Sequence, residues 1–524
     1  MRVRTIKFIS LVLCFVCFYS YSFSQSQPKA QGYVFLDKNK NGVKDSDEPG
    51  IHGVRVSNQR EITTTDREGK WELPYDDDTI FFVLKPRNYV NPIDPEKQIA
   101  RFYYIHKSKG SPKMKYPAVE PTGPLPKSID FPLYVNNEPH EFRILVFGDT
   151  QPRDLREVNY IKRDIVEPLI GFKGAFGVIL GDIVFDDLSL FDPLTKTIAQ
   201  IGMPWYYVLG NHDIDFLAPN HESADDAYEA FYGPSYYSFD YGPVHFVVLN
   251  NVKWHPANPE LNQRGRYTSG LGEKQLEWLK NDLNPIPKNQ LVVLMMHIPI
   301  TELEEKEEVF RLLEDRPFSF SMSAHTHYQE HLFLKEEHGW KAKQPHHHFI
   351  SVTACGSWWQ GAPDELGIPH TTMRSGAPNG YSIITFAGNS YFIEFFAARR
   401  PENYQMHIQI PDEILMSKLR DTKVYVNVFA GSEKSTVEMR LHNTNTWTIL
   451  NKVSEPDPWY QLLFDRDKEL APPYRALPRP MSSPHLWVGS LPRYLSPGVY
   501  TLEVKTRDMF NKTYVASKVF TVTK

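Results

Sequence analysis

The segment from Gly177 to Asp213 decides the fold: it begins GVILGDIVFDD (residues 177–187) and ends MPWYYVLGNHD (203–213). Each half is a short apolar run that stops at a glycine followed by polar residues, Asp182 in the first half and Asn211, His212 and Asp213 in the second. In an α/β protein this pattern is typical of a buried strand whose carboxyl end carries ligand-binding side chains. The segment therefore predicts two such strands, with a crossover helix over residues 188–201 between them.

Three further predicted strands end in the same way. The stretch FRILVFGDTQ (142–151) ends in Gly-Asp-Thr-Gln, LVVLMMH (291–297) ends in histidine and FSFSMSAHTH (318–327) ends in His-x-His. In an extended segment residues i and i+2 lie on the same side, so Asp149 with Gln151, and His325 with His327, can each address one site as a pair. All these strands end in oxygen or nitrogen ligands and none in a thiol. This donor set favours Mn, Fe, Zn or Co over thiophilic metals.

The five blocks resemble the calcineurin-like metallophosphoesterases, whose pattern is D-x-H, G-D-x-x-x-D, G-N-H-[DE], a lone His and G-H-x-H. The chain departs from this pattern at Gln151, where the family usually has His, and at Ala324, where it usually has Gly. The resemblance implies a four-layer α/β/β/α core that holds two divalent metal ions with the Asp182 carboxylate between them. One ion would be held by Asp149, Gln151, Asp182 and His327, and the other by Asp182, Asn211, His297 and His325.

The resemblance also implies a reaction. A hydroxide between the two ions would attack the phosphorus of a phosphomonoester or phosphodiester in line. His212 would stabilise the transition state or protonate the leaving oxygen, with Asp213 or another carboxylate fixing its tautomer. Taken singly, these residues have structural alternatives, since His297 could be a packed core histidine and Asp186 a helix cap. The five blocks in order predict the metal site.

The N-terminus has the pattern of a secretory signal peptide, basic to Lys7, apolar from Phe8 to Tyr19 and cleavable before Gln25. We expect residues 1–24 to be removed and the protein to be periplasmic, surface-associated or extracellular. Lipoprotein attachment at Cys14 is the less favoured alternative, because Leu13 fits poorly before an acylated cysteine. The apolar run is too short to span a membrane, so no transmembrane helix is expected after cleavage. Only Cys355 would remain, which excludes an internal disulfide.

The charge of the chain bears on its partners. The formal net charge is −5, and removal of three basic residues with the signal peptide makes it −8. A mildly acidic protein has no broad nucleic-acid footprint, which argues against a nuclease. The expected substrate is a small-molecule or lipid phosphoester, and the oligomeric state stays open. A surface- or carbohydrate-binding protein built on a degenerate phosphoesterase scaffold is the alternative, and Gln151 is the residue that supports it.

The chain divides into three predicted domains after the signal peptide: an N-terminal β-sandwich with a covering segment (25–135), the phosphoesterase domain (141–398) and a C-terminal β-sandwich (401–524). The stretch from Asp37 to Leu73 resembles the B-type repeats of bacterial surface adhesins, which are small transthyretin-like sandwiches. Alternating strands with turn signals from about residue 423 favour an immunoglobulin- or fibronectin-type sandwich at the other end.

A possible calcium site lies in the first of these domains. Residues 37–48 match the twelve-position calcium loop, although a strand precedes the loop and Pro49-Gly50 follows it where an EF-hand would continue into a helix. The alternative is a solvated acidic loop that binds nothing. The candidate ligands of one structural Ca²⁺ are Asp37, Asn39, Asn41, Val43, Asp45 and Glu48.

Two tracts after His327 contain further candidates. Trp358 and Trp359 lie on a Gly- and Pro-rich loop with Asp364 and His370, a loop that could fold over a substrate cleft; the alternative is that one Trp caps the core. His346, His347 and His348 are consecutive, and because side chains alternate along a strand they cannot all reach one ion. The tract and the C-terminal domain resemble a group of exported bacterial phosphoesterases that carry their own N- and C-terminal domains.

Overall fold

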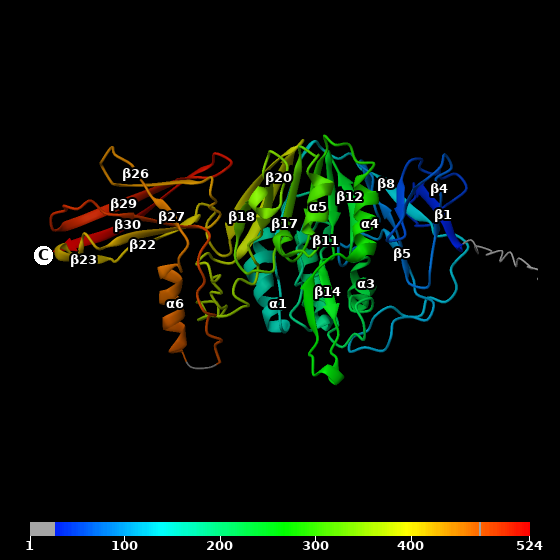
Figure 1. Cartoon of the computed structure of the whole chain (residues 1–524), viewed down its shortest axis with the longest axis horizontal. Coiled ribbons are helices and arrows are strands. Elements are labelled where there is room, and N and C mark those ends of the chain that lie inside the picture. Colours follow the sequence, from blue (N-terminus) through cyan, green and yellow to red (C-terminus); the bar gives the residue numbers. More distant parts are fainter. Residues whose placement is uncertain (1–26, 471–472) are drawn as a thin grey trace, which may run out of the picture.

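The structure is a computed structural model that describes residues 27–470 and 473–524. The predicted signal peptide lies outside the described residues. Three parts follow one another along the long axis of the molecule, with an α/β core in the middle and a β domain at each end (Figure 1). Within the described ranges, no helix combines the length and the apolar character that a membrane crossing requires.

Two mixed β-sheets form the core. The five-stranded sheet has the order β11-β10-β9-β20-β21 and the six-stranded sheet the order β12-β13-β16-β17-β19-β18. Strands β9, β10 and β11 run parallel, as do β13, β16, β17 and β19. The bounds in the first sheet are β9 (Glu141–Phe147), β10 (Phe176–Ile179), β11 (Trp205–Tyr207), β20 (Gly380–Ala387) and β21 (Ser390–Ala397), and in the second β12 (Tyr237–Tyr241), β13 (Val244–Val248), β16 (Leu291–Met295), β17 (Ser319–Ser323), β18 (Glu330–Leu334) and β19 (His346–Ile350).

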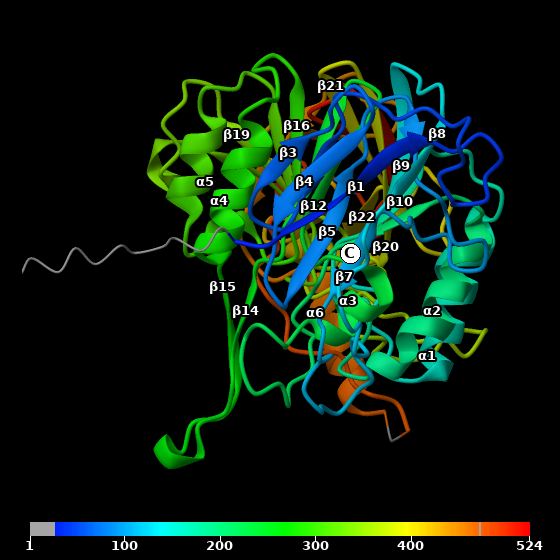
Figure 2. The same ribbon diagram turned by 90° about the vertical axis from the view of Figure 1, so that its right-hand side faces the viewer.

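Helices cover both outer faces of this pair of sheets, as Figure 2 shows with α1 and α2 on one side and α4 and α5 on the other. The helices of the core are α1 (Leu155–Ile161), α2 (Phe191–Ile198), α3 (Asp226–Tyr232), α4 (Gly272–Leu283) and α5 (Lys306–Leu313). Short 3₁₀ turns are η2 (Glu167–Leu169), η3 (Leu188–Leu190), η4 (Ala199–Ile201), η5 (Pro259–Leu261), η6 (Ile300–Glu302) and η7 (Glu336–His338), and η1 (Lys162–Val166) is a π-helical turn. The core is therefore the predicted four-layer α/β/β/α arrangement.

The apolar periodicity explains most of this helical layer. The helical segment after β9 begins at Asp154, whose carboxylate accepts the Glu157 backbone N–H at 2.9 Å, and continues through α1, η1 and η2. Val158, Ile161 and Ile165 from its apolar stripe are buried against the five-stranded sheet. Leu155, at the first position of α1, is 59% exposed.

The N-terminal domain is a sandwich of two four-stranded sheets, with the orders β4-β1-β8-β6 and β3-β2-β5-β7. Its hydrophobic core joins that of the α/β part in one cluster, in which Phe82 packs on Trp278 of α4 with ring centroids 6.2 Å apart. The strands are β1 (Lys29–Leu36), β2 (Arg55–Ser57), β3 (Ile62–Thr64), β4 (Lys70–Pro74), β5 (Thr79–Leu84), β6 (Tyr89–Val90), β7 (Tyr103–His106) and β8 (Phe131–Val135).

Charged groups are buried where the N-terminal domain meets α4. Arg55 of β2 donates to the Asp282 carboxylate at 2.8 Å, and His245 of β13 lies between Asp282 (2.9 Å) and Asp240 (2.7 Å). The His245 and Asp282 side chains are fully buried. Each of these buried ion pairs requires both partners, because a buried charge without its partner destabilises the fold by about 3–5 kcal/mol. The N-terminal domain is thus tied to the core by polar as well as apolar contacts.

The C-terminal domain consists of a four-stranded sheet (β22-β24-β28-β27) and a five-stranded sheet (β23-β30-β29-β25-β26) around a hydrophobic core of its own. Its elements are β22 (Met406–Gln409), β23 (Glu413–Leu415), η8 (Met416–Lys418), β24 (Lys423–Val428), β25 (Thr436–Leu441), β26 (Thr448–Ile449), β27 (Asn451–Val453), α6 (Pro458–Lys468), β28 (Leu486–Ser490), β29 (Gly498–Arg507) and β30 (Thr513–Thr523). The sequence predicted strands only, and α6 is an addition. A remaining two-stranded arm, β14 (Val252–His255) with β15 (Arg266–Ser269), projects from the core (Figure 2).

Candidate metal centre

The seven predicted metal ligands lie together at the carboxyl ends of strands from both core sheets. Asp149 follows β9, Asp182 follows β10, Asn211 follows β11, and the histidines follow β16 and β17. Asp182, His297 and His325 each place a ligand atom within 4.8 Å of the others. All seven side chains are buried except that of His325, which is half-buried. Parallel pairing aligns the strand ends within each sheet, and the packing of the two sheets brings Asp149 and His325 together, although they are 176 positions apart in the chain.

Glycine is required at two of these strand ends. A side chain at Gly181 would place its Cβ atom 2.6 Å from His297 Nδ1, and the residue has φ +86°. A Cβ at Gly210 would lie 2.0 Å from the Asp182 backbone nitrogen. These contacts are too short for any other residue, so the glycine before each polar ligand allows the two strand ends to approach.

The Asp149 half of the centre contains an oxygen without a partner. Asp149 Oδ2 accepts the His325 backbone N–H at 3.1 Å, whereas the buried Oδ1 has no hydrogen-bond donor in the described structure and lies 3.7 Å from His327 Nε2. Gln151 turns its amide nitrogen toward Asp182 Oδ2 at 2.9 Å. Burying a carboxylate oxygen without a donor is unfavourable, and a bound cation would satisfy it.

The other half is a chain of short polar contacts. His297 Nε2 lies 3.1 Å from Asn211 Oδ1, 3.2 Å from Asp182 Oδ1 and 3.1 Å from His325 Nδ1. The opposite nitrogen of His297, Nδ1, contacts the Leu180 carbonyl at 2.8 Å, and His327 Nδ1 contacts the Gly356 carbonyl at 2.6 Å. These carbonyls accept N–H donors, which leaves the Nε2 atoms of both rings free to bind a metal.

The backbone of the centre is strained. Asp149, Gln151, Asp182, His325 and His327 all have positive φ angles, between 25° and 70°. Side chains other than glycine rarely adopt this conformation, and each instance persists only where the surrounding structure enforces it. Ala324, one of the two departures from the family pattern, is not among these residues, so its methyl group adds no backbone strain.

Opposing charges set the protonation of the cluster. Burial disfavours the charged form of Asp182, but attraction to His297, His212 and His325 outweighs it and holds the pKa of Asp182 well below its usual range. Burial likewise opposes charge on His297, yet the carboxylates of Asp182 and Asp149 raise its pKa to about 9. Burial lowers the pKa of His325 to about 4 and that of His327 to about 3, so these two rings are neutral ligands at pH 7.

His212 lies beside the cluster and pairs with Asp186. Its Nδ1 is 2.5 Å from Asp186 Oδ1, its backbone N–H donates to Asp182 Oδ1 at 2.9 Å, and Phe185 stacks on its ring with centroids 4.6 Å apart. The predicted catalytic role of Asp213 is corrected by this geometry. The Asp213 carboxylate accepts the backbone N–H groups of Ile183, Val184 and Gly210. Asp213 therefore links the loop after β10 to the loop after β11.

The covering segment contributes to the wall of the centre, which the sequence did not indicate. Tyr116 donates its hydroxyl to the Asp186 carbonyl at 2.7 Å, and its backbone N–H donates to Asp215. On the other side, Arg153 lies over Phe185 at 4.1 Å and donates to the Trp358 carbonyl at 2.7 Å. Asp186 was within reach of sequence reasoning, because it is the second Asp of G-D-x-x-x-D, whereas no local pattern marks Tyr116.

The predicted substrate-cleft residues separate into three places. Trp358 stacks on His327 with ring centroids 3.9 Å apart and thus borders the metal centre. Trp359 is a correction, since it is 2% exposed in the hydrophobic core and its indole donates to the Thr150 carbonyl at 3.2 Å. Asp364 and His370 are also corrected, because they line a separate cavity against α6. Gly361, between Trp359 and Asp364, has φ 100°, a conformation that favours glycine.

The consecutive histidines alternate between the two faces of β19. His346 and His348 contact Ser319, Ser321 and Ser323 on one face at 2.7–3.0 Å, and His347 contacts His331 and Tyr391 on the other at 3.0 and 2.8 Å. Burial lowers the pKa of His346 and of His348 to about 3. These neutral rings are hydrogen-bonded core residues.

The predicted calcium loop is held closed by its own side chains. Asp37 accepts the backbone N–H groups of Lys40 and Gly42 at 2.6 and 2.9 Å, and Glu48 accepts those of Lys38 and Asp45 at 2.7 and 3.1 Å. Both carboxylates are nearly buried, at 2% and 4% exposure. The Asp45 carboxylate accepts the side-chain amides of Asn39 and Asn41, while Val43 is exposed. Calcium binding by this loop stays a prediction.

Comparison with known families and proteins gives three consecutive matches along the chain. The family model described as calcineurin-like phosphoesterase matches residues 142–329, and the models for the N terminal and C terminal of calcineurin-like phosphoesterase match residues 38–118 and 348–514. The last match begins inside the core, at β19, and so includes the closing hairpin β20-β21 as well as the C-terminal sandwich.

Individual relatives are more distant. Acid phosphatase type 7 from Mus musculus is 25% identical over 175 residues, which cover 30% of this chain and 35% of that protein. Serine-aspartate repeat-containing protein F from Staphylococcus epidermidis is 53% identical over 47 residues, which cover 8% of this chain and 3% of that protein. The solved structure of purple acid phosphatase PPD1 from yellow lupin seeds aligns with 70% of this chain and 66% of its own at 12% identity and a TM-score of 0.35. The chain thus spans about a third or less of the curated relatives it matches.

Proposed function

The chain belongs to the calcineurin-like phosphoesterase family, and on that premise we propose that it hydrolyses a phosphomonoester or phosphodiester with the help of two divalent metal ions. The observation that carries the proposal is the convergence of two carboxylates, two amides and three histidines on one buried point, with Asp149 Oδ1 lacking any hydrogen-bond donor there within the described structure. A site of this composition suits Mn, Fe, Zn or Co.

The residues present fit such a pair of ions. Asp149, Gln151, Asp182 and His327 would hold one, and Asp182, Asn211, His297 and His325 the other. Divalent ions at these positions would act as Lewis acids toward the phosphoryl oxygens and lower the pKa of a bound water. His297 must give up the proton that the neighbouring carboxylates stabilise, since only the neutral imidazole binds a metal. Metal affinity should therefore rise with pH.

His212 is the proposed acid or transition-state donor. Attraction to Asp182 and Asp186 outweighs burial and raises the pKa of His212 above its ordinary value, which favours the protonated ring. The Asp186 carboxylate would accept the hydrogen bond from Nδ1–H, which leaves Nε2 as the atom that would act on the substrate. Phe185 and the Tyr116-anchored turn at Asp186 keep the ring in this orientation.

The wider setting is also a proposal. A signal peptide over residues 1–24 would export the protein, and a small-molecule or lipid phosphoester would be its substrate. Loop 37–48 would bind one structural Ca²⁺, supported by two nearly buried carboxylates that end the loop. Each of these points rests on the sequence pattern and needs a test of its own.

Activity and metal content of the purified protein test the proposal together. A panel of p-nitrophenyl monoesters and diesters, assayed with added Mn²⁺, Zn²⁺ and Mg²⁺, should show metal-dependent hydrolysis of one ester class. Elemental analysis should then find close to two ions per chain. Less than one ion per chain with no turnover of either class would overturn the proposal and favour a binding protein on a degenerate scaffold.

A further inference from the structure

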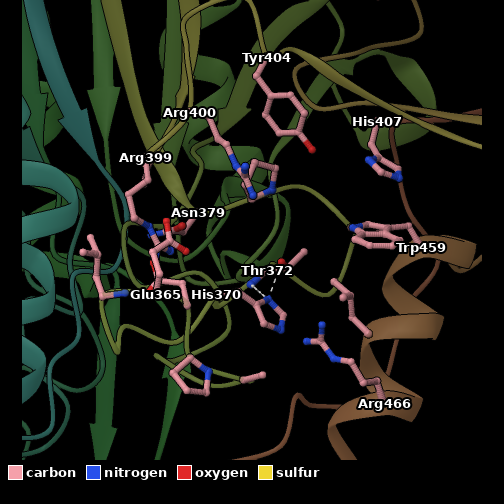
Figure 3. Close-up of a pocket in the computed structure, with 18 residues that line it drawn as sticks. Glu365, His370, Thr372, Asn379, Arg399, Arg400, Tyr404, His407, Trp459 and Arg466 are labelled. Carbon is pink, nitrogen blue, oxygen red and sulfur yellow. Dashed lines mark hydrogen bonds and ion pairs between the residues drawn. The ribbon is translucent and has the colours of Figure 1, made fainter. Parts of the chain in front are cut away.

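A second cavity lies between the catalytic core and the C-terminal domain, apart from the metal centre. It has a volume of about 530 Å³ and none of the predicted metal ligands lines it. Core residues Glu365, His370 and Arg399 form one side, and Tyr404, His407, Trp459 and Arg466 face it from the C-terminal part (Figure 3). Cavities of roughly 300–1,000 Å³ are the usual size for small-molecule sites.

The three arginines that line the cavity differ in whether a carboxylate is paired with them. Arg399 is paired with Asp364 and with Asp164, whose Oδ1 lies 3.3 Å from Arg399 Nε. Arg466 contacts Asp467 at 2.7 Å. Arg400 is exposed, lies over the Tyr404 ring at 5.5 Å and has no carboxylate partner in the described part of the chain. Its guanidinium extends into the cavity and is free to bind an anion (Figure 3).

Two carboxylates at the cavity, Asp364 in its wall and Asp467 next to it, already have hydrogen-bond donors. Asp364 accepts the backbone N–H groups of Leu366 and Ile368 at 2.9 Å in addition to Arg399. Asp467 accepts the Ala362 backbone N–H at 2.9 Å and contacts His370 Nε2 at 3.1 Å. These contacts leave Arg400 as an uncompensated positive charge inside the cavity and Glu365 as an exposed acceptor at its rim.

Groups with one polar and one apolar part complete the wall. The Tyr404 hydroxyl points into the cavity, and Trp459 presents the edge of its indole there while His407 stacks on its face with centroids 4.7 Å apart (Figure 3). Trp459 is held at the start of α6 by the Asp457 carboxylate, which accepts its backbone N–H at 2.8 Å. Rings that combine an apolar surface with an N–H or O–H donor suit a ligand that has both hydroxyls and a carbon ring.

We propose that this interdomain cavity binds a sugar that carries an oxyanion. Arg400 would bind the oxyanion, which can be a carboxylate or a phosphate. Tyr404, Trp459 and Glu365 would bind the hydroxyls, with Glu365 as the acceptor. A bare inorganic anion has no hydroxyl to donate to Glu365 and would leave most of the cavity empty, which is why the sugar ring belongs to the proposal.

Calorimetric titration of the full chain tests this assignment with three probes: glucuronic acid, glucose 6-phosphate and glucose. Glucuronic acid, glucose 6-phosphate or both should bind at least tenfold more tightly than glucose. The Arg400→Gln variant should lose at least tenfold of that affinity, and Tyr404→Phe a smaller part. Binding of glucuronic acid alone assigns a carboxylate ligand, and binding of glucose 6-phosphate alone assigns a phosphate ligand.

Arg420→Gln is the matched control, because Arg420 is another exposed arginine over a tyrosine ring, at 5.7 Å from Tyr494, outside the cavity. It should bind the probes as the parent does, and Arg400→Gln should keep the parent's melting temperature. The proposal is overturned if neither charged sugar binds the parent. It is also overturned if binding survives in Arg400→Gln but disappears in Asp182→Asn, which would place the probe at the metal centre.

Discussion

Replacing Gln151 by histidine should tighten the weaker of the two metal sites. In the structure the buried Gln151 amide nitrogen donates to Asp182 Oδ2 at 2.9 Å, and its carbonyl oxygen lies 3.7 Å from Cys355 Sγ. The amide therefore occupies a carboxylate lone pair that an ion in the Asp149 half would need. A neutral amide oxygen is also a harder and weaker donor toward zinc than an imidazole nitrogen.

The size of the effect follows from that hydrogen bond. A hydrogen bond to a charged group contributes about 1.5–3 kcal/mol, and an ion that takes Asp182 Oδ2 must break it. Because about 1.4 kcal/mol corresponds to a tenfold change in affinity, the amide should weaken the site by roughly 10- to 100-fold. The Gln151→His variant should recover at least tenfold of this loss and shift the site from Mn²⁺ toward Zn²⁺.

Calorimetric titration of Mn²⁺ and Zn²⁺ into the metal-free parent and variant measures both affinities. The parent should show two unequal sites and be activated by added Mn²⁺. Gln151→Met, which keeps the chain length without an amide, separates the lost donor from the gained ligand and should tighten the site less than Gln151→His does. Two equal, zinc-selective sites in the parent would refute the reasoning.

Four other predictions concern the centre and the ends of the molecule. Asp182→Asn should lose both metals and all activity while circular dichroism stays unchanged; an active variant would remove Asp182 from its bridging position. His212→Ala and Asp186→Asn should keep both ions yet lower kcat, His212→Ala by about 10²- to 10⁴-fold, whereas loss of metal from His212→Ala in elemental analysis would make His212 a ligand. Calcium chelation should lower the melting temperature of the parent, and the Asp37→Ala, Glu48→Ala double variant should lack this response; a variant that responds like the parent would end the calcium assignment. Burial opposes charge on His245, but Asp282 and Asp240 outweigh burial and raise the pKa of this histidine. The stability that the charged ring contributes is therefore complete below about pH 6.5 and is lost as the pH rises through the raised pKa. Urea unfolding should show His245→Gln destabilised more at pH 6 than at pH 9, and an equal loss of stability at both pH values would reduce the role of His245 to packing.

Much of the centre was predictable because its ligands follow from a local rule. A buried parallel strand ends at the sheet edge, and a polar residue at that point is recognisable in each block: Asp or Asn after a glycine in three blocks, and a histidine in the other two. Asp149, Asp182, Asn211, His297 and His325 were found in this way, and the structure brings them to one edge. The same alternation of side chains along a strand explained why His346, His347 and His348 do not share one point.

Partners across the fold were not predictable, because hydrogen bonds between loops leave no periodic pattern in the chain. His212 could pair with either of two nearby carboxylates, and only the tertiary structure shows Asp186 beside it and Asp213 bound by backbone N–H groups. Trp359 and His370 likewise stand on one loop in sequence but face a hydrophobic core and a separate cavity.

The domain interfaces show most clearly which features the sequence determines and which the tertiary structure decides. Polar residues at strand ends, helical periodicity and turn signals are local features, so the sequence alone determined the three-part organisation, the α/β core and the set of metal-capable residues. Which surfaces meet depends on the three-dimensional shapes of distant segments: Tyr116 reaches Asp186 from 70 residues away, and Arg55 reaches Asp282 from 227 residues away. The helix α6, whose Asp467 contacts Ala362 and His370, was likewise decided only by tertiary packing, and with it the cavity between the core and the C-terminal domain.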